Sequence, residues 1–404
     1  MSGSITRACA SLLAGTLLAA PALAQEPAAR QPAPHHGPDL TKVASFAHQV
    51  TGVAVSKDGR IFVNFPRWTE DTAVSVAELK DGTLTPFPDA EWNGWRNTRK
   101  DTVSARDHWV CVQSVVADPK GNVWVLDPAA PAMAAVVKDG PKLVEIDLKT
   151  NRPARTIAFD ETVAPQGSYL NDVRFSPDGR TAYLTDSGAS GALVVVDLDS
   201  GKARRLLDGD PTTMPDKSVT VSYDGKPLRR PDGRGVEFAA DGIALSVDGK
   251  TLYWQAIKGK TLYSLPTDAL TGWLASSVVP GALTDQSLSG KVETVGENGP
   301  ADGLIISRHD GRMYVSAPEE DAVKVRDLSA RGGKPTVLVQ DPRLRWPDTF
   351  AEAPDGTILF TTSHIQDSAF YKPGAPAALP TELWRIRPSS ADATGSTGST
   401  IAPR

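Results

Sequence analysis

Cysteine is nearly absent from this chain of 404 residues, which has only Cys9 and Cys111. Cys9 falls in an N-terminal segment that we expect to be removed on export, so Cys111 is left without a partner. An internal disulfide is therefore excluded from the mature chain, which must be held together by packing. Because Cys111 lies in a strand-like apolar run, we interpret it as a small buried hydrophobe.

Long apolar runs and an excess of basic charge are also missing. After residue 24 no run of about 18 apolar residues occurs, so the sequence offers no transmembrane helix. The 43 basic and 48 acidic residues are interspersed and give a net charge of -5, which argues against nucleic acid as a partner. No G-x-S-x-G, phosphate-loop, dinucleotide or H-E-x-x-H motif stands at a useful position, so serine hydrolysis, nucleotide use and zinc proteolysis have no support.

The N-terminal 24 residues have the features of a secretory signal peptide. A short apolar stretch ends in the small-residue pattern Ala-Leu-Ala24, which is typical of a cleavage site. We therefore expect cleavage near Ala24 and a secreted or periplasmic protein. Residues 25–39 are rich in Pro and Ala and are expected to form a flexible leader, so we discount the pair His35 and His36 as a metal site. Residues 389–404 are expected to be a disordered tail.

One pattern occurs six times: a polar residue, a short alternating apolar run, an Asp-Gly-like turn and a second apolar run. Because a tight turn needs positive φ, Asp-Gly between alternating apolar residues predicts a hairpin. Each copy therefore begins a four-stranded unit, and six units predict an all-β, six-bladed β-propeller over residues 40–388. The copies are residues 51–59, 113–121, 171–179, 241–249, 302–311 and 348–356.

The last repeat lacks a fourth strand of its own. Residues 382–387 form an expected outer strand, after which the sequence becomes rich in Ser, Thr and Gly. Residues 41–46 precede the first copy as residues 336–339 precede the sixth, so we predict that this N-terminal strand closes the last blade. The long connections should lie on the face where the polar residues begin, which favours a binding site there. They are residues 64–73, 91–108, 127–140, 208–239 and 366–381.

The polar residues that open the six copies are the main candidates for a binding site. In a propeller they surround one end of the central channel, where three carboxylates would repel one another. A cation such as Ca²⁺ would offset this repulsion, with Asn171, Asp241 and Asp302 as candidate ligands. Alternatively an arginine pairs with the carboxylates, one carboxyl stays protonated, or the ring only braces turns. The six polar residues are Thr51, Gln113, Asn171, Asp241, Asp302 and Asp348, and the candidate arginines are Arg67, Arg174 and Arg345.

Aromatic and histidine side chains gather in the same loops. Trp68 follows the first blade and Trp346 precedes the sixth, and both join Arg67 among the candidate ligand-binding residues. Such side chains suit a flat aromatic ligand, although burial as lids is the alternative. A histidine or a carboxyl group could transfer a proton near neutral pH. The candidate catalytic residues are Asp302, Asp348, His108 and His364.

Six segments resemble the major royal jelly protein and Yellow family, and most of all its bacterial branch, in order and spacing. They are residues 107–115 (DHWVCVQSV), 122–127 (NVWVLD), 141–148 (PKLVEIDL), 168–173 (SYLNDV), 182–188 (AYLTDSG) and 241–246 (DGIALS). The resemblance runs from about residue 50 to residue 386. It implies a secreted propeller that binds a small aromatic or lipidic ligand in its channel, and in some members dopachrome tautomerisation.

The sequence is more distantly similar to the gluconolactonase and senescence-marker propellers. That resemblance implies a divalent cation held by Glu, Asn and Asp side chains at the starts of blades. The matching positions here are Thr51, Asn171, Asp241 and Asp302. Thr51 stands where that family has Glu, and Asp241 where it often has Asn, so the oxygen set is altered.

Three functions are compatible with these features. The first is an exported, monomeric propeller that binds a small molecule, such as an aromatic one, at the channel mouth. The second is a metal-assisted lactone hydrolase or dopachrome-type tautomerase, in which a cation polarises a carbonyl and an Asp or His moves the proton. The third is a scaffold whose loop face docks another exported protein.

Overall fold

A computed structural model describes residues 35–36, 39–69, 71–272, 285–329, 332–374 and 378–388. The predicted signal peptide, most of the predicted leader and the predicted tail lie outside these residues. Within the leader, strand β1 (His35–His36) pairs with Val339 and Gln340. In the described part of the chain, no helix has the length and apolar character needed to cross a membrane.

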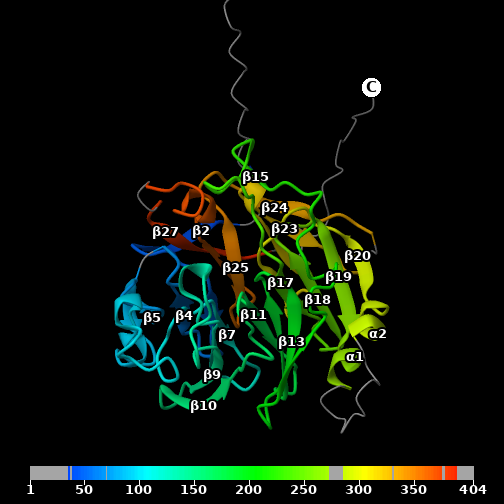
Figure 1. Ribbon diagram of the computed structural model, residues 1–404. Helices are drawn as coiled ribbons and strands as arrows, with labels where there is room; N and C mark the ends of the chain where they lie inside the picture. The colour runs from blue at the N-terminus through cyan, green and yellow to red at the C-terminus, as the bar shows by residue number, and fades with distance from the viewer. Residues whose placement is uncertain are drawn as a thin grey trace, which may run out of the picture. The chain divides into compact units, whose positions relative to one another are not determined.

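Six antiparallel sheets form the blades of a propeller (Figure 1), five with four strands and one, in the fifth blade, with β1 as an additional fifth strand. Blade one consists of β3 (Val53–Val55), β4 (Ile61–Asn64), β5 (Val76–Lys80) and β6 (Thr83–Pro86). Blade two consists of β7 (Ser114–Ala117), β8 (Val123–Asp127), β9 (Lys142–Asp147) and β10 (Arg152–Ala158). Blade three consists of β11 (Leu170–Phe175), β12 (Thr181–Asp186), β13 (Ala192–Asp197) and β14 (Ala203–Leu206). Blade four consists of β17 (Ala240–Leu245), β18 (Thr251–Ala256), β19 (Thr261–Pro266) and β20 (Glu293–Glu297). Blade five contains β21 (Leu304–Ile306), β22 (Met313–Ala317), β23 (Ala322–Arg326) and β24 (Thr336–Gln340). Blade six consists of β25 (Pro347–Glu352), β26 (Ile358–Thr362), β27 (Thr381–Ile386) and β2 (Thr41–Phe46).

Each repeat copy forms the first strand of a blade and the turn after it, and the second strand follows directly, as predicted. The turn glycine takes a positive φ in all six copies, from 63° at Gly179 to 96° at Gly121, and this region of backbone space favours glycine. The first strands lie innermost, because β3 contacts β7, β7 contacts β11, and so on through β17, β21 and β25 back to β3. The predicted six-bladed propeller is therefore confirmed.

The N-terminal strand closes the ring. Strand β2 pairs antiparallel with β27, from Thr41 opposite Arg385 to Phe46 opposite Thr381. The last blade is thus built from both ends of the propeller sequence, as predicted, and its outer edge is covered.

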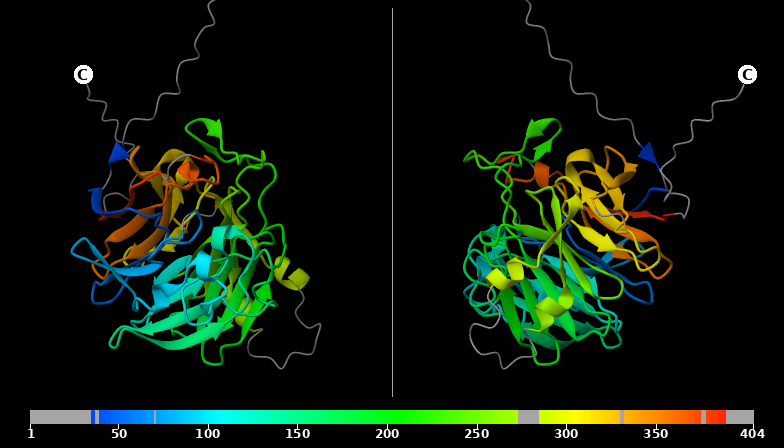
Figure 2. Two further views of the ribbon diagram at one scale, coloured as in Figure 1. Left: turned by 60° about the vertical axis from the view of Figure 1, so that its left-hand side comes forward. Right: turned by 90° about the vertical axis from the view of Figure 1, so that its right-hand side faces the viewer.

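Short elements occupy the connections (Figure 2). Helices α1 (Thr267–Thr271) and α2 (Asp285–Ser289) lie between β19 and β20, and the hairpin of β15 (Ser222–Tyr223) and β16 (Lys226–Pro227) lies between blades three and four. Five short 3-10 turns are η1 (Trp92–Gly94), η2 (Asn97–Arg99), η3 (Pro131–Met133), η4 (Pro318–Glu320) and η5 (Ile365–Asp367).

The core lies between neighbouring blades. Trp124 of blade two packs on Phe175 of blade three with 5.3 Å between ring centroids, and Trp254 of blade four joins a buried cluster with Leu193 of blade three. Both tryptophans are buried, so they pack between blades. Cys111 is fully buried, also as interpreted from the sequence, and burial raises the pKa of its thiol to about 12.

The inner strands of blades four, five and six approach one another at their first residues. A β-carbon on Gly242 would lie 2.1 Å from the carbonyl oxygen of Asp302, and one on Gly303 would lie 2.0 Å from that of Asp348. Only glycine avoids these collisions. Each glycine follows the polar residue that opens its copy, so the missing side chains allow Asp241, Asp302 and Asp348 to converge.

We expect Gly303→Ala to destabilise the protein by roughly 2–3 kcal/mol, since the added methyl group must push a backbone carbonyl away. Urea unfolding measures this change. The control is Gly235→Ala, where the nearest atom to an added β-carbon is 3.6 Å away, and it should change the stability by less than about 0.5 kcal/mol. Equal stability of the two variants would show that the strands are not held this closely.

Candidate functional site

Five of the six polar residues that open the copies line one small cavity at an end of the channel, here called the acidic cavity. Its volume is about 10 Å³, enough for about one water molecule. Three of the predicted long loops also reach it, through Trp68, Met133 and Phe238. Its lining is Trp68, Gln113, Met133, Tyr169, Asn171, Ser187, Phe238, Asp241, Ile257, Asp302, Asp348 and Ile365.

β-Bulges aim several of these side chains at the channel. The pairing register shifts between Leu170 and Val173, between Ala240 and Gly242, and between Pro347 and Phe350. Asn171, Asp241 and Asp348 lie inside these three irregular segments. A bulge takes a residue out of the ladder and re-aims its side chain, so the same local device places polar groups toward the axis in blades three, four and six.

Burial raises the pKa of all three carboxyl groups. It raises the pKa of Asp302 to about 6, although hydrogen bonds from Trp346 and Asp241 act in the opposite direction. The pKa values of Asp241 and Asp348 rise well above the ordinary 3.8, first through burial and then through the negative charge of Asp302. Asp241 and Asp302 also act on each other, since their interaction raises the pKa of Asp241 and lowers that of Asp302.

None of the three candidate arginines neutralises this cluster. Arg67 is buried and donates to loop carbonyls, including those of Trp109 at 2.5 Å and Val110 at 3.0 Å. Burial lowers the pKa of Arg67 to about 10. Arg174 forms an ion pair with Asp172 at 2.8 Å, and Arg345 with Asp224 at 3.0 Å and Asp367 at 3.1 Å.

The other side of the acidic cavity is neutral. Tyr169 donates its hydroxyl hydrogen to Gln113 Oε1 at 3.0 Å and accepts a hydrogen bond from Trp68 Nε1. Sequence reasoning missed Tyr169, although it stands only two positions before Asn171. It also missed Asp172, which accepts a hydrogen bond from Ser114 Oγ at 2.7 Å and adds a further negative charge near the three aspartates.

Two other predicted binding residues support the cavity without lining it. Trp346 is buried and donates from Nε1 to Asp302 Oδ2 at 2.6 Å, so it positions that carboxyl group. Thr51 is fully buried, and its hydroxyl accepts from Asn64 Nδ2 at 2.8 Å and donates to the Gln113 carbonyl at 3.3 Å. Because these bonds occupy it, Thr51 braces the junction of blades one and two.

The two candidate histidines lie outside the cavity lining. His108 approaches Asp107 at 3.1 Å. His364 contacts the Ala378 carbonyl through Nδ1 at 2.9 Å and Glu382 through Nε2 at 3.3 Å. Of the candidate catalytic residues, only Asp302 and Asp348 therefore reach the acidic cavity.

The donor set fits a hard cation in its chemistry. Three carboxyl groups and the amides of Asn171 and Gln113 offer oxygen atoms, which Ca²⁺ prefers, and the space suits a single ion. Among the described residues, no three His, Cys, Asp or Glu side chains already form a metal shell. Because burial raises the pKa values of Asp241 and Asp348, an entering cation would have to displace protons from the cluster.

The arrangement defines a class: a six-bladed propeller with buried acidic residues at one end of its channel. A family model described as major royal jelly protein matches residues 110–349. The chain therefore belongs to the major royal jelly protein family. No functionally curated protein matches its sequence.

Two solved structures illustrate the breadth of the fold. A gluconolactonase from Xanthomonas campestris is 13% identical with a TM-score of 0.50, covering 86% of this chain and 89% of its own. A structure described as luciferin-regenerating enzyme is 12% identical with a TM-score of 0.51, covering 88% of this chain and 96% of its own. At such identities the likeness establishes the shared propeller fold.

In the metal-free protein, the acidic cluster should make the stability fall as pH rises. Below about pH 4 the carboxyl groups are protonated in both the folded and the unfolded chain. As pH rises toward the folded pKa of Asp302, about 6, the unfolded chain loses its proton first, so the free energy of unfolding decreases. Asp302→Asn should remove on the order of 2–3 kcal/mol of this decrease.

Urea unfolding in the presence of a chelator, at about pH 4.5 and about pH 7.5, measures most of this decrease, which begins near the unfolded pKa of about 4 and ends above the folded pKa of Asp302. Asp232→Asn is the matched control, because Asp232 is exposed and pairs only with Arg234 among the described interactions. A pH dependence that is the same in wild type and Asp302→Asn would contradict the burial of a strained carboxyl group at this position.

Proposed function

We propose that the acidic cavity binds a divalent cation of the Ca²⁺ class and that a small molecule binds with it at the channel mouth. One observation carries this proposal. Asp241, Asp302 and Asp348 converge in a buried cavity, and none of the described residues that line it is basic. Fully ionised, this cluster is unstable without a positive charge, and a cation supplies that charge where the protein does not.

Oxygen donors and a narrow space favour a hard ion over a soft one. The expected signal peptide would deliver the protein to a compartment outside the cytoplasm, and we propose that location for it. Ca²⁺ sites of extracellular modules work with dissociation constants of about 10⁻⁴–10⁻³ M. A modest affinity would therefore suffice, which matches a site that must first lose a proton.

The small molecule would meet an aromatic lid. Trp68 lies 6.4 Å from Tyr169 and 6.1 Å from Phe370, measured between ring centroids, and Arg230 lies 5.5 Å over the Phe370 ring. Trp68 and Tyr169 line the acidic cavity, and Phe370 packs against the same hydrophobic cluster. A ligand must displace part of this lid, and a flat aromatic molecule would best replace the contacts that are lost.

We expect Ca²⁺ to bind chelator-treated protein with a stoichiometry of one and a dissociation constant of about 10⁻⁵–10⁻³ M, as measured by calorimetric titration. Tb³⁺ offers a direct readout. Because Trp346 contacts Asp302 at 2.6 Å, excitation of tryptophan should sensitise the luminescence of a bound Tb³⁺, and Ca²⁺ should quench it by competition.

Asp302→Asn and Asp348→Asn should each weaken cation binding by at least about tenfold, the equivalent of 1.4 kcal/mol. Asp232→Asn should leave binding unchanged, since this exposed carboxylate lies outside the acidic cavity. Absence of saturable binding at millimolar Ca²⁺, or equal binding by Asp302→Asn and the control, would refute the proposal.

A second candidate function is hydrolysis or isomerisation of a small carbonyl compound. The observation that favours it is the pKa of Asp302, raised to about 6, which suits a general acid or base near neutral pH. A bound cation would polarise the substrate carbonyl. The structural similarity to a gluconolactonase suggests lactones as the first substrate class to assay. A dopachrome-type quinone, suggested by the family resemblance of the sequence, is the second.

If the chain is such an enzyme, lactone consumption should fall at least about a hundredfold in Asp302→Asn, which keeps the shape but loses the proton-transfer group. The rate of lactone hydrolysis, corrected for spontaneous hydrolysis, can be measured by pH-stat titration or by a colorimetric assay. Retention of full activity by Asp302→Asn would exclude a catalytic role for that carboxyl group. Cation binding would still be tested separately, by the calorimetric titration described above.

A further inference from the structure

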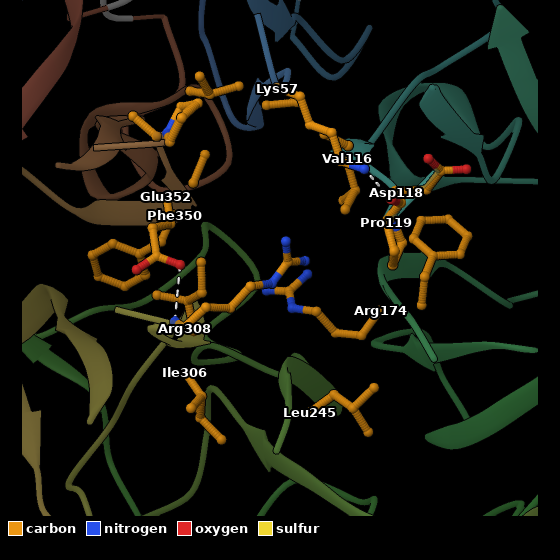
Figure 3. Close-up of a pocket in the computed structure, with 18 of the residues that line it drawn as sticks. Lys57, Val116, Asp118, Pro119, Arg174, Leu245, Ile306, Arg308, Phe350 and Glu352 are labelled. Carbon is orange, nitrogen blue, oxygen red and sulfur yellow. Dashed lines mark hydrogen bonds between the residues drawn. The ribbon is translucent and has the colours of Figure 1, made fainter. Parts of the chain in front are cut away.

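The opposite end of the channel opens into a larger pocket, here called the basic pocket (Figure 3). Its volume is about 640 Å³, within the range of small-molecule sites. No described residue lines both this pocket and the acidic cavity. The sixth residue after the polar residue of each repeat copy lines it, so all six blades contribute. These residues are Lys57, Pro119, Pro177, Val247, Arg308 and Pro354.

Positive charge faces the interior of the basic pocket. Figure 3 shows the guanidinium groups of Arg174 and Arg308, from different blades, extending toward the middle of the pocket. Arg174 is held in place by Asp172 at 2.8 Å and by the Leu304 carbonyl at 2.7 Å. Arg308 is exposed, and its guanidinium has no hydrogen bond or ion pair with any described residue. Its charge is therefore available to a ligand.

The two carboxylates of the pocket are turned into its wall. Asp118 accepts hydrogen bonds from two backbone amides of its own hairpin turn, at 2.7 and 2.8 Å, and from Trp124 Nε1 at 2.9 Å. Glu352 accepts hydrogen bonds from Ser307 Oγ at 2.5 Å and from the backbone amides of Arg308 and His309 at 2.9 and 3.2 Å. These bonds hold both carboxylates in structural roles, so neither is committed to Arg308 or Lys57.

Apolar side chains also line the pocket. The ends of the inner strands present hydrophobic side chains between the charged ones, among them Val55, Phe175, Leu245, Ile306 and Phe350. Lys57 donates to the Pro119 carbonyl, which places its ammonium group at the wall of the pocket while leaving it without a carboxylate partner among the described residues. The pocket thus combines cations with a hydrophobic surface.

We propose that the basic pocket binds a small organic anion, an acidic group attached to an apolar body. The acidic group lies against Arg308 and Lys57, where charge-assisted hydrogen bonds are available. The apolar body lies on the hydrophobic ends of the inner strands, which gives binding its free energy through burial. This site is separate from the cation and ligand site proposed at the other end of the channel and does not depend on it.

The test compares two fluorescent probes of the same shape. Anilinonaphthalene sulfonate carries a negative charge, and phenylnaphthylamine is its uncharged counterpart. We expect the sulfonate to bind the full-length protein with a stoichiometry of one and to bind at least about fivefold more tightly than the neutral probe, because one charge-assisted contact contributes about 1 kcal/mol or more. Added salt should lower the binding affinity of the sulfonate and leave that of the neutral probe nearly unchanged.

Arg308→Gln should lower the affinity for the sulfonate by about fivefold or more, and adding Lys57→Gln to it should lower the affinity further. Arg308→Lys should retain most of the affinity, because it keeps the positive charge. The matched control is Arg152→Gln, an exposed arginine on outer strand β10 that should change nothing. Asp302→Asn should also bind the sulfonate normally, which separates this result from the fate of the cation site. Equal affinity for the two probes, or unchanged sulfonate binding by Arg308→Gln, would overturn the proposal.

Discussion

The close approach of three inner strands at one end of the channel is the constraint on which the candidate site depends. The backbones at Gly242 and Gly303 lie so near the next blade that a β-carbon would collide with a carbonyl oxygen. The side chains that precede these glycines therefore meet near the axis, whatever their chemistry. Because they are aspartates, the constraint converts a packing feature into a buried cluster of negative charge.

The loops above that cluster keep the acidic cavity small. The loops above it bring Trp68, Met133 and Phe238 to the channel mouth, which excludes water and raises the pKa of each carboxyl group by desolvation. The nearby arginines are used elsewhere: Arg67 ties loop carbonyls together and Arg345 pairs with other acids. The protein thus leaves the negative charge to be balanced by protons or by an ion small enough to enter.

Much of this arrangement could be predicted from the sequence, because the repeat copies align position by position. Once the blade starts were known, Gln113, Asn171 and the three aspartates had to lie at one end of the channel. Roles that depend on tertiary neighbours could not be predicted in this way. Thr51 occupies an equivalent position but is covered by Asn64, and Trp346 turned out to hold a carboxyl group. Tyr169 was overlooked because it precedes the aligned segment.

The two ends of the channel differ in charge, and a single ion pair connects them. Asp172 adds to the negative charge that raises the pKa of the acidic cluster, while its partner Arg174 extends into the basic pocket (Figure 3). The pair separates the charges of the two ends, because its negative member adds to the acidic cluster and its positive member adds to the basic pocket. Since the two cavities share no lining residue, a cation at one end and an anion at the other would contact different side chains.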